Sequence, residues 1–443
     1  MPKKAVFVCT NCGSQSPKWS GRCDQCESWG SLVEEALDKQ NTAQTATIPE
    51  TSKLDDIATK DTEARLASGS SEIDRVLGGG IVVGSTALLA GEPGIGKSTL
   101  LLQVATRIAA EHKVLYISGE ESLQQVSMRA QRLQLQPEQL ELVSSTDTDA
   151  IAALIDKGDY SLVIVDSIQT LSTGRLNSNP GSVSQITTSA HILQQAAKTQ
   201  EAAVLMVGHV TKEGSIAGPK ILEHLVDTVL HLEGEQFGGF KLLRSVKNRF
   251  GPTHEVGVFE MQDKGLVTVD NPSDRFLQER QPGPGSVVCA TMEGTRSLLV
   301  EVQALVNASP FGYPKRTSVG FDTNRLNVLI AVLDRHAGVA LADKDVYVNV
   351  VGGLRLQEPA ADLAIALAIC SAAQHQPIAG QRVCFGEIGL SGEVRSVSHM
   401  QSRIKEAQRL QFSGAIGPQS QAKFVESVPT MKQAVASAFQ QTQ

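Results

Sequence analysis

The sequence predicts an α/β protein built around a doubly wound domain, with a cysteine knuckle before it and a mixed α+β domain after it. Short apolar runs, typical of buried parallel strands, lie at 85–90, 112–118, 161–166 and 202–209. Helical segments lie between them: 98–110 puts Leu101, Val104, Ala105 and Ile108 on one face, and 183–200 does the same with Ile186, Ala190, Leu193 and Ala197. This alternation predicts a parallel sheet covered by helices.

The length and composition of the chain exclude a membrane-spanning protein but few classes of binding partner. The 443 residues are enough for two or three domains, and the composition (41% hydrophobic, 20% charged) is ordinary for a soluble protein. No apolar run approaches the ~18 residues that a membrane span needs, and the first residues lack a secretory cleavage site. We therefore expect a cytoplasmic protein without membrane association. The net charge of −7 leaves nucleic acid open, because salt confines each charge's reach to about 10 Å.

Four zones follow one another along the chain. Residues 1–36 hold a cysteine cluster, and 37–62 are polar and poor in large apolar side chains, which predicts a flexible linker. Residues 63–270 carry the strand–helix alternation. After a turn-rich stretch, 271–443 form the second mixed domain, with strands expected at 297–306 and 346–353 and an apolar helix at 359–374.

Four of the seven cysteines crowd the first zone: Cys9, Cys12, Cys23 and Cys26. They form two Cys-x2-Cys pairs separated by ten residues, and four thiolates suit a tetrahedral Zn²⁺ ion. A redox dithiol is the alternative. Trp19 and Trp29, with Lys18 and Arg22, contact nucleic acid or a protein in one interpretation; in the other, the tryptophans supply the small core of this module.

The sharpest motif is a phosphate-binding loop, Gly91-Glu92-Pro93-Gly94-Ile95-Gly96-Lys97-Ser98. Its glycines let backbone N–H groups converge on the phosphates of ATP. Lys97 places a positive charge at the β- and γ-phosphates, and the Ser98 hydroxyl coordinates Mg²⁺. The loop follows an apolar strand and opens an amphipathic helix, as this motif requires, which disfavours a chance glycine-rich turn.

Acidic residues end two of the predicted strands. Asp166 closes the run 162–165 and is the expected second Mg²⁺ ligand; alone, it is also consistent with a helix N-cap. Glu120 and Glu121 follow the strand 112–118, at the sheet edge where ligands of open α/β sheets bind. Either can polarise the attacking water, or both are first-turn helix acids that favour the helix dipole.

A second basic motif, Lys247-Asn248-Arg249-Phe250-Gly251, follows the strand-like stretch FKLLRSV. Two cations near a nucleotide-binding core suggest an arginine-finger arrangement that acts on a neighbour's γ-phosphate. From composition alone, a solvated turn is the favoured interpretation.

In five features taken in order, the chain resembles the RadA family, also called Sms, of bacterial DNA-repair and recombination proteins. These features are the four-cysteine knuckle, GEPGIGKS, the aspartate of LVIVD, GHVTKEGSIAGPKILEHLVD (208–227) and KNRFG. The resemblance covers nearly the whole chain, and it favours the functional interpretation of KNRFG. It implies a RecA-like core related to hexameric helicases, with ATP bound between subunits.

The resemblance also implies roles for single residues. Lys247 and Arg249 serve the adjacent subunit's site or couple it to DNA, and Glu120 matches the catalytic glutamate. His209, at the end of a core strand, matches a γ-phosphate sensor. Residues 211–220 form a mobile DNA-facing loop, in which Lys212 and Lys220 are candidate phosphate contacts.

The last zone resembles the proteolytic domain of Lon. Ala360 stands where Lon has its catalytic serine, and Gln401 stands where it has its lysine. Without a nucleophile and a base there is no route to an acyl-enzyme, so we expect a scaffold for ring assembly and DNA contact. Lys315, Arg316 and Arg325 are candidate DNA contacts there, although a charged surface loop is the default.

The leading hypothesis is a DNA-stimulated, helicase-like ATPase that translocates on single-stranded DNA and extends recombination intermediates by branch migration. Its expected partners are single-stranded and branched DNA, a RecA-type recombinase and further copies of itself in a hexameric ring. Its expected cofactors are ATP, Mg²⁺ and Zn²⁺. The alternatives are a Lon-like ATP-dependent protease and a KaiC-like ATP-binding regulator that assembles without moving DNA. Translocation polarity does not follow from the sequence.

Overall fold

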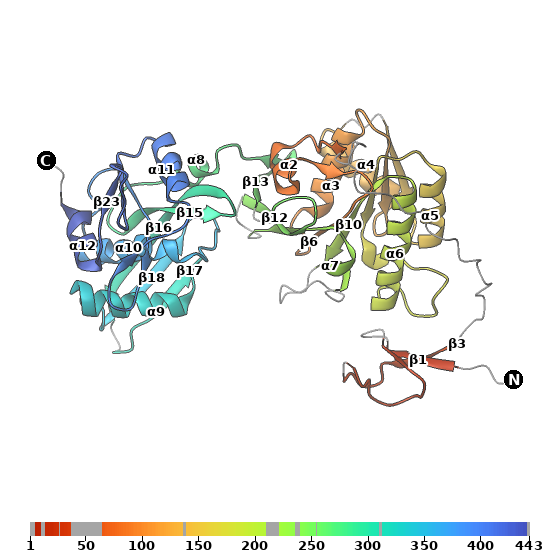
Figure 1. Ribbon diagram of the computed structural model, residues 1–443, viewed down its shortest axis with the longest axis horizontal. Coiled ribbons are helices and arrows are strands. Elements are labelled where there is room, and N and C mark those ends of the chain that lie inside the picture. The colour runs from red at the N-terminus through yellow and green to blue at the C-terminus, as the bar shows by residue number, and fades with distance from the viewer. Residues whose placement is uncertain are drawn as a thin grey trace, which may run out of the picture. The chain divides into compact units, whose positions relative to one another are not determined.

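The computed structural model describes residues 5–9, 14–25, 27–36, 64–135, 139–209, 221–234, 240–253, 255–309 and 312–440 (Figure 1). The chain divides into two compact units, and each is described by itself. The first comprises 1–233 with 241–268, and the second comprises 234–240 with 269–443. The linker expected at 37–62 lies outside the described residues. No described helix is long and apolar enough to cross a lipid bilayer.

The N-terminal segment is a three-stranded antiparallel sheet in the order β2-β1-β3. Its strands are β1 (Ala5–Cys9), β2 (Gln15–Ser16) and β3 (Leu32–Ala36). Cys9, Cys23 and Leu32 are buried together, with Phe7 packed against them. So small a core is typical of a module that depends on a metal for its stability.

A nine-stranded sheet forms the centre of the first unit, in the order β14-β13-β12-β11-β6-β10-β9-β7-β8. Its parallel part comprises β6 (Thr86–Gly91), β7 (Val114–Ser118), β8 (Leu140–Ser144), β9 (Leu162–Asp166), β10 (Ala203–His209) and β11 (Thr228–Glu233). It is extended by β12 (Phe240–Asn248), β13 (Val256–Gln262) and β14 (Gly265–Thr268). A short pair, β4 (Arg65–Leu66) and β5 (Ile81–Val82), lies apart.

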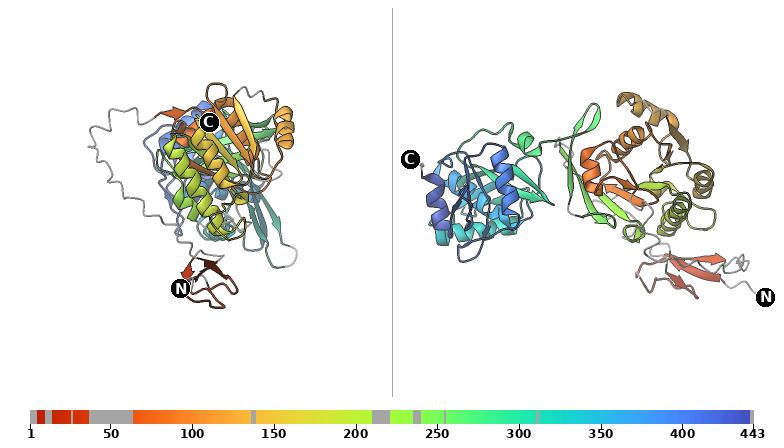
Figure 2. Two further views of the ribbon diagram at one scale, coloured as in Figure 1. Left: turned by 90° about the vertical axis from the view of Figure 1, so that its right-hand side faces the viewer. Right: turned by 45° about the horizontal axis from the view of Figure 1, so that its top comes forward.

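Helices cover both faces of this sheet, as Figures 1 and 2 show. They are α2 (Ser71–Leu77), α3 (Lys97–Ile108), α4 (Leu123–Arg132), α5 (Thr148–Lys157), α6 (Val183–Thr199) and α7 (Ile221–Leu225), with a 3-10 turn, η1 (Ile168–Thr170). One core packs α2 and α3 against one face, and a second packs α5 and α6 against the other. The doubly wound fold predicted from strand–helix alternation is confirmed.

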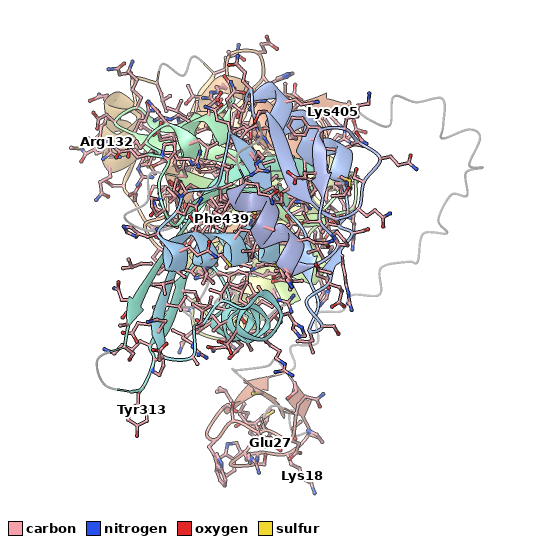
Figure 3. The ribbon with its side chains drawn as sticks, turned by 90° about the vertical axis from the view of Figure 1, so that its left-hand side faces the viewer. Lys18, Glu27, Arg132, Tyr313, Lys405 and Phe439 are labelled. Atoms are coloured by element: carbon pink, nitrogen blue, oxygen red, sulfur yellow. The ribbon has the colours of Figure 1, made fainter. Side chains whose placement is uncertain are left out.

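The second unit holds a seven-stranded mixed sheet in the order β17-β18-β16-β15-β19-β22-β23. Its strands are β15 (Ser286–Glu293), β16 (Arg296–Ala308), β17 (Arg316–Val319), β18 (Lys344–Val350), β19 (Arg382–Cys384), β22 (Gly414–Gly417) and β23 (Val425–Ser427). A separate pair joins β20 (Glu387–Ile388) to β21 (Val394–Arg395). Tyr313 lies between β16 and β17 in the chain, at the tip of the projection that these strands form (Figure 3). Its side chain is 87% exposed.

The helices of this unit are α8 (Pro272–Leu277), α9 (Thr323–Val332), α10 (Asp362–Gln374), α11 (Met400–Arg409) and α12 (Met431–Phe439). A π-helical turn, η2 (Leu333–Ala337), continues α9, and a 3-10 turn, η3 (Pro359–Ala361), precedes α10. Residues Asp362–Ser371 of α10 are all buried, which explains why its sequence is apolar all round. The helix predicted at 359–374 is therefore real, with its first three residues in the 3-10 turn.

Candidate functional site

The phosphate-binding loop joins the end of β6 to the start of α3. Gly94 has φ +77°, and a Cβ there would meet no other atom of the described residues within 4 Å, so backbone conformation alone requires glycine. Gly96 has φ +116°, and a Cβ there would lie 2.8 Å from Met261 Cε. Gly96 caps α3 without a side-chain hydrogen bond, so the N–H groups of the first helical turn remain available to phosphate.

Lys97 folds back over this loop. Its Nζ donates to the carbonyl oxygens of Gly91 (2.8 Å) and Glu92 (3.0 Å), and the residue is 4% exposed. Burial lowers the pKa of Lys97, while the negative charges of Asp166 and Glu120 act in the opposite direction. The two acids therefore lie close enough to Lys97 for the three side chains to form one charged cluster.

Asp166 and Glu120 are each held by a neighbouring hydroxyl. The Tyr116 hydroxyl donates to Asp166 Oδ2 at 2.6 Å, and the Ser167 hydroxyl donates to Glu120 Oε1 at 2.5 Å. Burial is the main cause that raises the pKa of Tyr116 well above its usual value, so this hydroxyl stays protonated and remains a donor.

The two adjacent glutamates have different surroundings. Glu121 forms an ion pair with Arg129 of α4, and its backbone N–H donates to the Ser118 hydroxyl at 3.0 Å. Glu120 instead bonds Ser167, the residue directly after Asp166. Of the two, Glu120 therefore lies beside the strand end that carries Asp166 and acts electrostatically on Lys97, whereas Glu121 is tied to α4.

The donor set fits Mg²⁺. The Ser98 hydroxyl and the Asp166 carboxylate are hard oxygen ligands, and Mg²⁺ in nucleotide sites is held by one or two such groups together with phosphate oxygens and waters. Ser98 is the second residue of α3, and Asp166 is the last residue of β9, only 9% exposed. These two residues would hold the ion beside the phosphates that Lys97 and the loop bind.

His209 closes β10, in register with Gly91 at the end of β6. The backbone position matches the predicted sensor, but the His209 side chain lies outside the described residues, so its role stays a prediction. Lys212 and Lys220, predicted to contact DNA, also lie outside them.

The motif KNRFG lies near the opposite end of β6. Arg249 Nη1 bonds Asp227 Oδ1 at 3.0 Å, and the other oxygen of Asp227 accepts the Thr86 backbone N–H at 3.0 Å. Five residue steps of about 3.3 Å separate Thr86 from Gly91, so this anchor lies roughly 17 Å from the phosphate-binding loop. The structure thus does not bring Arg249 to Lys97 of the same chain.

Lys247 and Asn248 fix the rest of the motif. Lys247 Nζ donates to the carbonyl oxygens of Glu223 (2.8 Å) and Val226 (2.8 Å), which caps the C-terminal end of α7. Asn248 Oδ1 accepts the Phe250 N–H at 2.9 Å, and a Cβ on Gly251 would lie 3.3 Å from Gly78 Cα. The motif thus spans the last two residues of β12 and the turn that follows, and it is tied to α7 by Lys247 and to α2 by Asn248 Nδ2, which donates to the Leu77 carbonyl oxygen at 3.2 Å.

Two of the four predicted zinc ligands can be placed. Cys9 and Cys23 are both buried, and the Ser14 hydroxyl lies 3.0 Å from Cys23 Sγ. Cys12 and Cys26 lie outside the described residues, so the tetrahedral set stays a prediction. Trp19 and Trp29 are 64% and 79% exposed, so the expectation that they supply the core of this module is wrong.

The candidate DNA residues of the second unit differ in their environment. The Lys315 backbone N–H donates to Asp345 Oδ1 at 2.7 Å, ahead of β17, and Arg316 begins that edge strand. Arg325 instead forms an ion pair with the buried carboxylate of Asp362 and donates to the Ile388 carbonyl oxygen at 3.0 Å. Its guanidinium is therefore committed to the interior contact, which disfavours the predicted DNA role.

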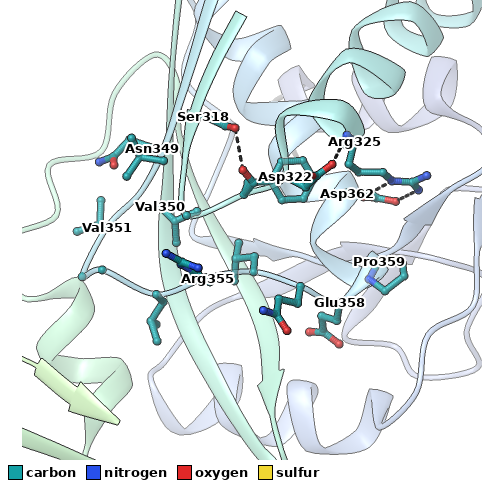
Figure 4. A pocket seen from close by; sticks show the side chains of 18 of the residues that line it. Ser318, Asp322, Arg325, Asn349, Val350, Val351, Arg355, Glu358, Pro359 and Asp362 are labelled. Carbon is teal, nitrogen blue, oxygen red and sulfur yellow. Dashed lines mark hydrogen bonds and ion pairs between the residues drawn. The ribbon is translucent and has the colours of Figure 1, made fainter. Parts of the chain in front are cut away.

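A cavity of about 1120 Å³ lies beside η3, as Figure 4 shows. Ala360 is a buried residue of η3 that does not line this cavity, and Gln401 is exposed on α11. Arg403, fully buried, makes two bonds to Glu358 (2.7 and 2.6 Å) and one to the Ala290 carbonyl oxygen (2.5 Å). The ion pair between Glu358 and Arg403 thus joins the two segments in which Lon has its catalytic serine and lysine. In this chain those two positions hold Ala360 and Gln401, which are neither a nucleophile nor a base.

Sequence reasoning did not find Tyr116, Ser167, Asp227 or Gln169. Both amide atoms of Gln169, in η1, are buried with no hydrogen-bond partner among the described residues, and its Nε2 lies 3.8 Å from where a Cβ on Gly208 would stand. One signal was available for Tyr116: among the first four residues of β7 (Val114–Ser118) it is the one side chain with a polar group, between the aliphatic Leu115 and Ile117.

Three family models match separate parts of the chain. Residues 48–215 match an AAA domain, 7–34 match a rubredoxin metal-binding domain, and 308–421 match the ChlI subunit of Mg-chelatase. Two solved structures overlap about half of the chain. The RadB recombinase has 22% identity and a TM-score of 0.38 (46% of this chain, 100% of that one), and a KaiC-like protein of Pyrococcus horikoshii OT3 has 19% and 0.40 (47% and 99%).

Curated relatives match almost end to end. Proteins named DNA repair protein RadA from Bacillus subtilis, Pseudomonas aeruginosa and Rickettsia bellii are 47%, 47% and 46% identical. The matches cover 94%, 94% and 97% of this chain, and 92%, 93% and 97% of theirs. Identity at this level over this length shows common descent of the zinc module, the ATPase core and the C-terminal unit together, so the chain belongs to the RadA family of DNA repair proteins.

Proposed function

We propose that this chain uses ATP hydrolysis to move along single-stranded DNA and to drive branch migration of recombination intermediates. The observation that carries the hydrolytic half is the charged cluster of Lys97, Asp166 and Glu120 beside an open helix N-terminus. Membership of a family of DNA repair proteins supports the DNA half. A motor that translocates binds the DNA backbone without reading sequence.

Each group of the cluster has a distinct task. Lys97 leaves the loop carbonyls to hold the β- and γ-phosphates, and the N–H groups of α3 bind the phosphate oxygens. Glu120, held by Ser167, orients the attacking water and accepts its proton. Ser98 and Asp166 would hold a Mg²⁺ ion, which would supply positive charge against the negative charge that develops on the phosphates.

Arg249 and Lys247 complete the site of a neighbouring subunit in this proposal. Support comes from the distance of roughly 17 Å, along β6, between the Arg249 anchor and the phosphate-binding loop of the same chain. A head-to-tail ring of subunits, six by analogy with related motors, would bring the Arg249 of one subunit to the Lys97 of the next. Single-stranded and branched DNA, and a RecA-type recombinase, are the proposed partners.

The test is a Lys97→Ala variant, with Lys113→Ala as its matched control. Lys113 is a surface lysine of the same unit that pairs with Glu141 at 3.1 Å. Lys97→Ala should abolish DNA-stimulated ATPase activity and branch migration while the thermal unfolding temperature stays near that of the parent; Lys113→Ala should retain both activities. Normal turnover by Lys97→Ala would overturn the assignment of the phosphate-binding loop.

The Lon-like protease alternative has little support. Catalysis by an acyl-enzyme needs a nucleophile beside a base, whereas Ala360 is a buried methyl group and Arg403 is engaged by Glu358. ATP-dependent degradation of casein by the purified protein would revive that alternative.

A further inference from the structure

Strand β7 contributes one side chain directly to the edge of the proposed Mg²⁺ site. Tyr116 is 1% exposed, and its ring lies in the core that packs against α3. In the sheet, Tyr116 is opposite Ile164 and Ser118 is opposite Asp166, so the tyrosine ring runs along the strand toward the carboxylate two positions ahead. Its hydroxyl donates to Asp166 Oδ2 at 2.6 Å.

The strand around Tyr116 gives no packing reason for a hydroxyl. The charges of Arg129 and Glu121 also act on this group, but its hydrogen-bond partner is Asp166. The neighbouring β7 residues Val114, Leu115 and Ile117 are aliphatic and buried, and a phenylalanine would fill the same volume. A buried hydroxyl without a partner costs about 1–3 kcal/mol. The hydroxyl is therefore favourable at this point because Asp166 accepts its hydrogen bond.

We propose that Tyr116 is a positioning residue for Mg²⁺ binding, which fixes the rotation of the Asp166 carboxylate before the ion arrives. The terminal torsion of aspartate is broad, so a carboxylate without a partner samples many rotations. The bond from Tyr116 engages Oδ2 and leaves the other oxygen for the ion. This inference rests on the proposed role of Asp166 as a Mg²⁺ ligand.

The expected loss of Mg²⁺ affinity on removal of the Tyr116 hydroxyl can be taken from other metal sites. Loss of a hydrogen bond to a metal-binding side chain typically costs about 10–100-fold in metal affinity. Because phosphates and Ser98 also hold the ion here, we expect the lower end, about 10-fold.

The chain offers a closely matched control. The Tyr160 hydroxyl donates to Glu141 Oε2 at the same distance, 2.6 Å, and Tyr160 is 4% exposed. Glu141 lies on β8, at the edge of the sheet, away from the phosphate-binding loop. Tyr160→Phe therefore removes one hydrogen bond from a buried tyrosine to a carboxylate of the same unit without touching the nucleotide site, although the Glu141 side chain is 51% exposed and that of Asp166 is buried.

The experiment titrates Mg²⁺ into the full-length protein and follows the binding of a fluorescent ADP analogue, with ATPase activity as a second measurement. Tyr116→Phe should need about 10-fold more Mg²⁺ for half-maximal enhancement of nucleotide binding. Binding of the analogue in EDTA should be unchanged, and Tyr160→Phe should match the parent in both measurements. Tyr116→Met, which also lacks the donor, replaces Tyr116→Phe if that variant is insoluble.

A parental Mg²⁺ titration by a folded Tyr116 variant would overturn the inference, and so would an equal loss in Tyr116→Phe and Tyr160→Phe. Asp166→Asn separately tests the assumption that Asp166 is a Mg²⁺ ligand. If Asp166→Asn binds Mg²⁺–nucleotide and hydrolyses ATP like the parent, the assignment of Asp166 fails, whatever the tyrosine variants do.

Discussion

Asp227 bonds Arg249 through one carboxylate oxygen (3.0 Å) and the Thr86 backbone N–H through the other (3.0 Å). The Arg249 backbone N–H also donates to the Asp227 carbonyl oxygen at 3.1 Å. Asp227 thus joins the KNRFG turn to the first residue of β6, the strand that ends at the phosphate-binding loop. Because Asp227 is only 6% exposed, its bond to the Thr86 backbone N–H belongs to the folded core, whereas the Arg249 side chain that it also binds is 55% exposed.

Asp227→Ala should lower the free energy of unfolding by about 1–3 kcal/mol, because it leaves the buried Thr86 N–H without its acceptor. Urea denaturation of the full-length chain measures this effect. Glu233→Ala is the control, since Glu233 pairs with Arg244 at 2.9 Å at the exposed C-terminal end of β11 and its loss should cost about 0–1 kcal/mol. Equal losses in the two variants would contradict the structural role of Asp227.

Arg249→Ala should fold normally yet lose ATP hydrolysis, because the guanidinium is half-exposed and its ion pair adds little stability. Mixing it with Lys97→Ala should restore activity. In randomly mixed rings about a quarter of the interfaces combine an intact Lys97 with an intact Arg249 from the neighbour. ATPase assays of mixtures over a range of ratios measure this; activity equal to the average of the two variants alone would rule out action between subunits. Arg244→Ala is the matched control.

Lys247→Ala should weaken the coupling of hydrolysis to DNA more than it weakens nucleotide binding. The variant leaves the carbonyl oxygens of Glu223 and Val226 at the end of α7 without their donor. We expect fluorescent ADP to bind with parental affinity, while single-stranded DNA no longer stimulates ATPase activity. Full stimulation by DNA would contradict this role.

Metal removal should act on the N-terminal module alone. Metal analysis should find one zinc ion per chain, and chelation should make the segment 1–36 sensitive to protease, because its core is only Cys9, Cys23, Leu32 and Phe7 among the described residues. Nucleotide binding by the ATPase core should persist. A metal-free protein with a protease-resistant N-terminus would argue against the zinc site.

Glu358→Ala should destabilise the second unit by about 3–5 kcal/mol, because it leaves the fully buried Arg403 without its carboxylate. Calorimetry of the full-length protein should show the loss in the transition of that unit. Glu426→Ala, which removes a half-exposed partner of Arg382, should cost less than about 1 kcal/mol. A parental transition in Glu358→Ala would show that the ion pair is not structural.

The strand and helix pattern of the ATPase core could be predicted closely, because its strands are buried on both faces and its helices are amphipathic. The expected helix 183–200 is α6 at 183–199, and the expected strand 161–166 is β9 at 162–166. Strand order could not be predicted, and this is why Tyr116 was missed: its contact with Asp166 exists only because β7 and β9 are neighbours. The residue pattern alone left Glu120 and Glu121 equivalent, and only the family resemblance favoured Glu120, since the difference in their surroundings depends on Arg129 across a turn.

The phosphate-binding loop and the Arg249 anchor lie near opposite ends of β6, so an assembly in which they act together between subunits would have a direction. If each subunit binds ATP beyond one end of this strand and presents Arg249 at the other end, then the surface that carries Arg249 differs from the surface that carries the ATP site. Two subunits related by a two-fold axis present the same surface to each other. Subunits that contact one another through two different surfaces assemble head to tail instead. The two faces of such an assembly are different. A motor protein needs this difference to move in one direction along single-stranded DNA, whose two ends also differ.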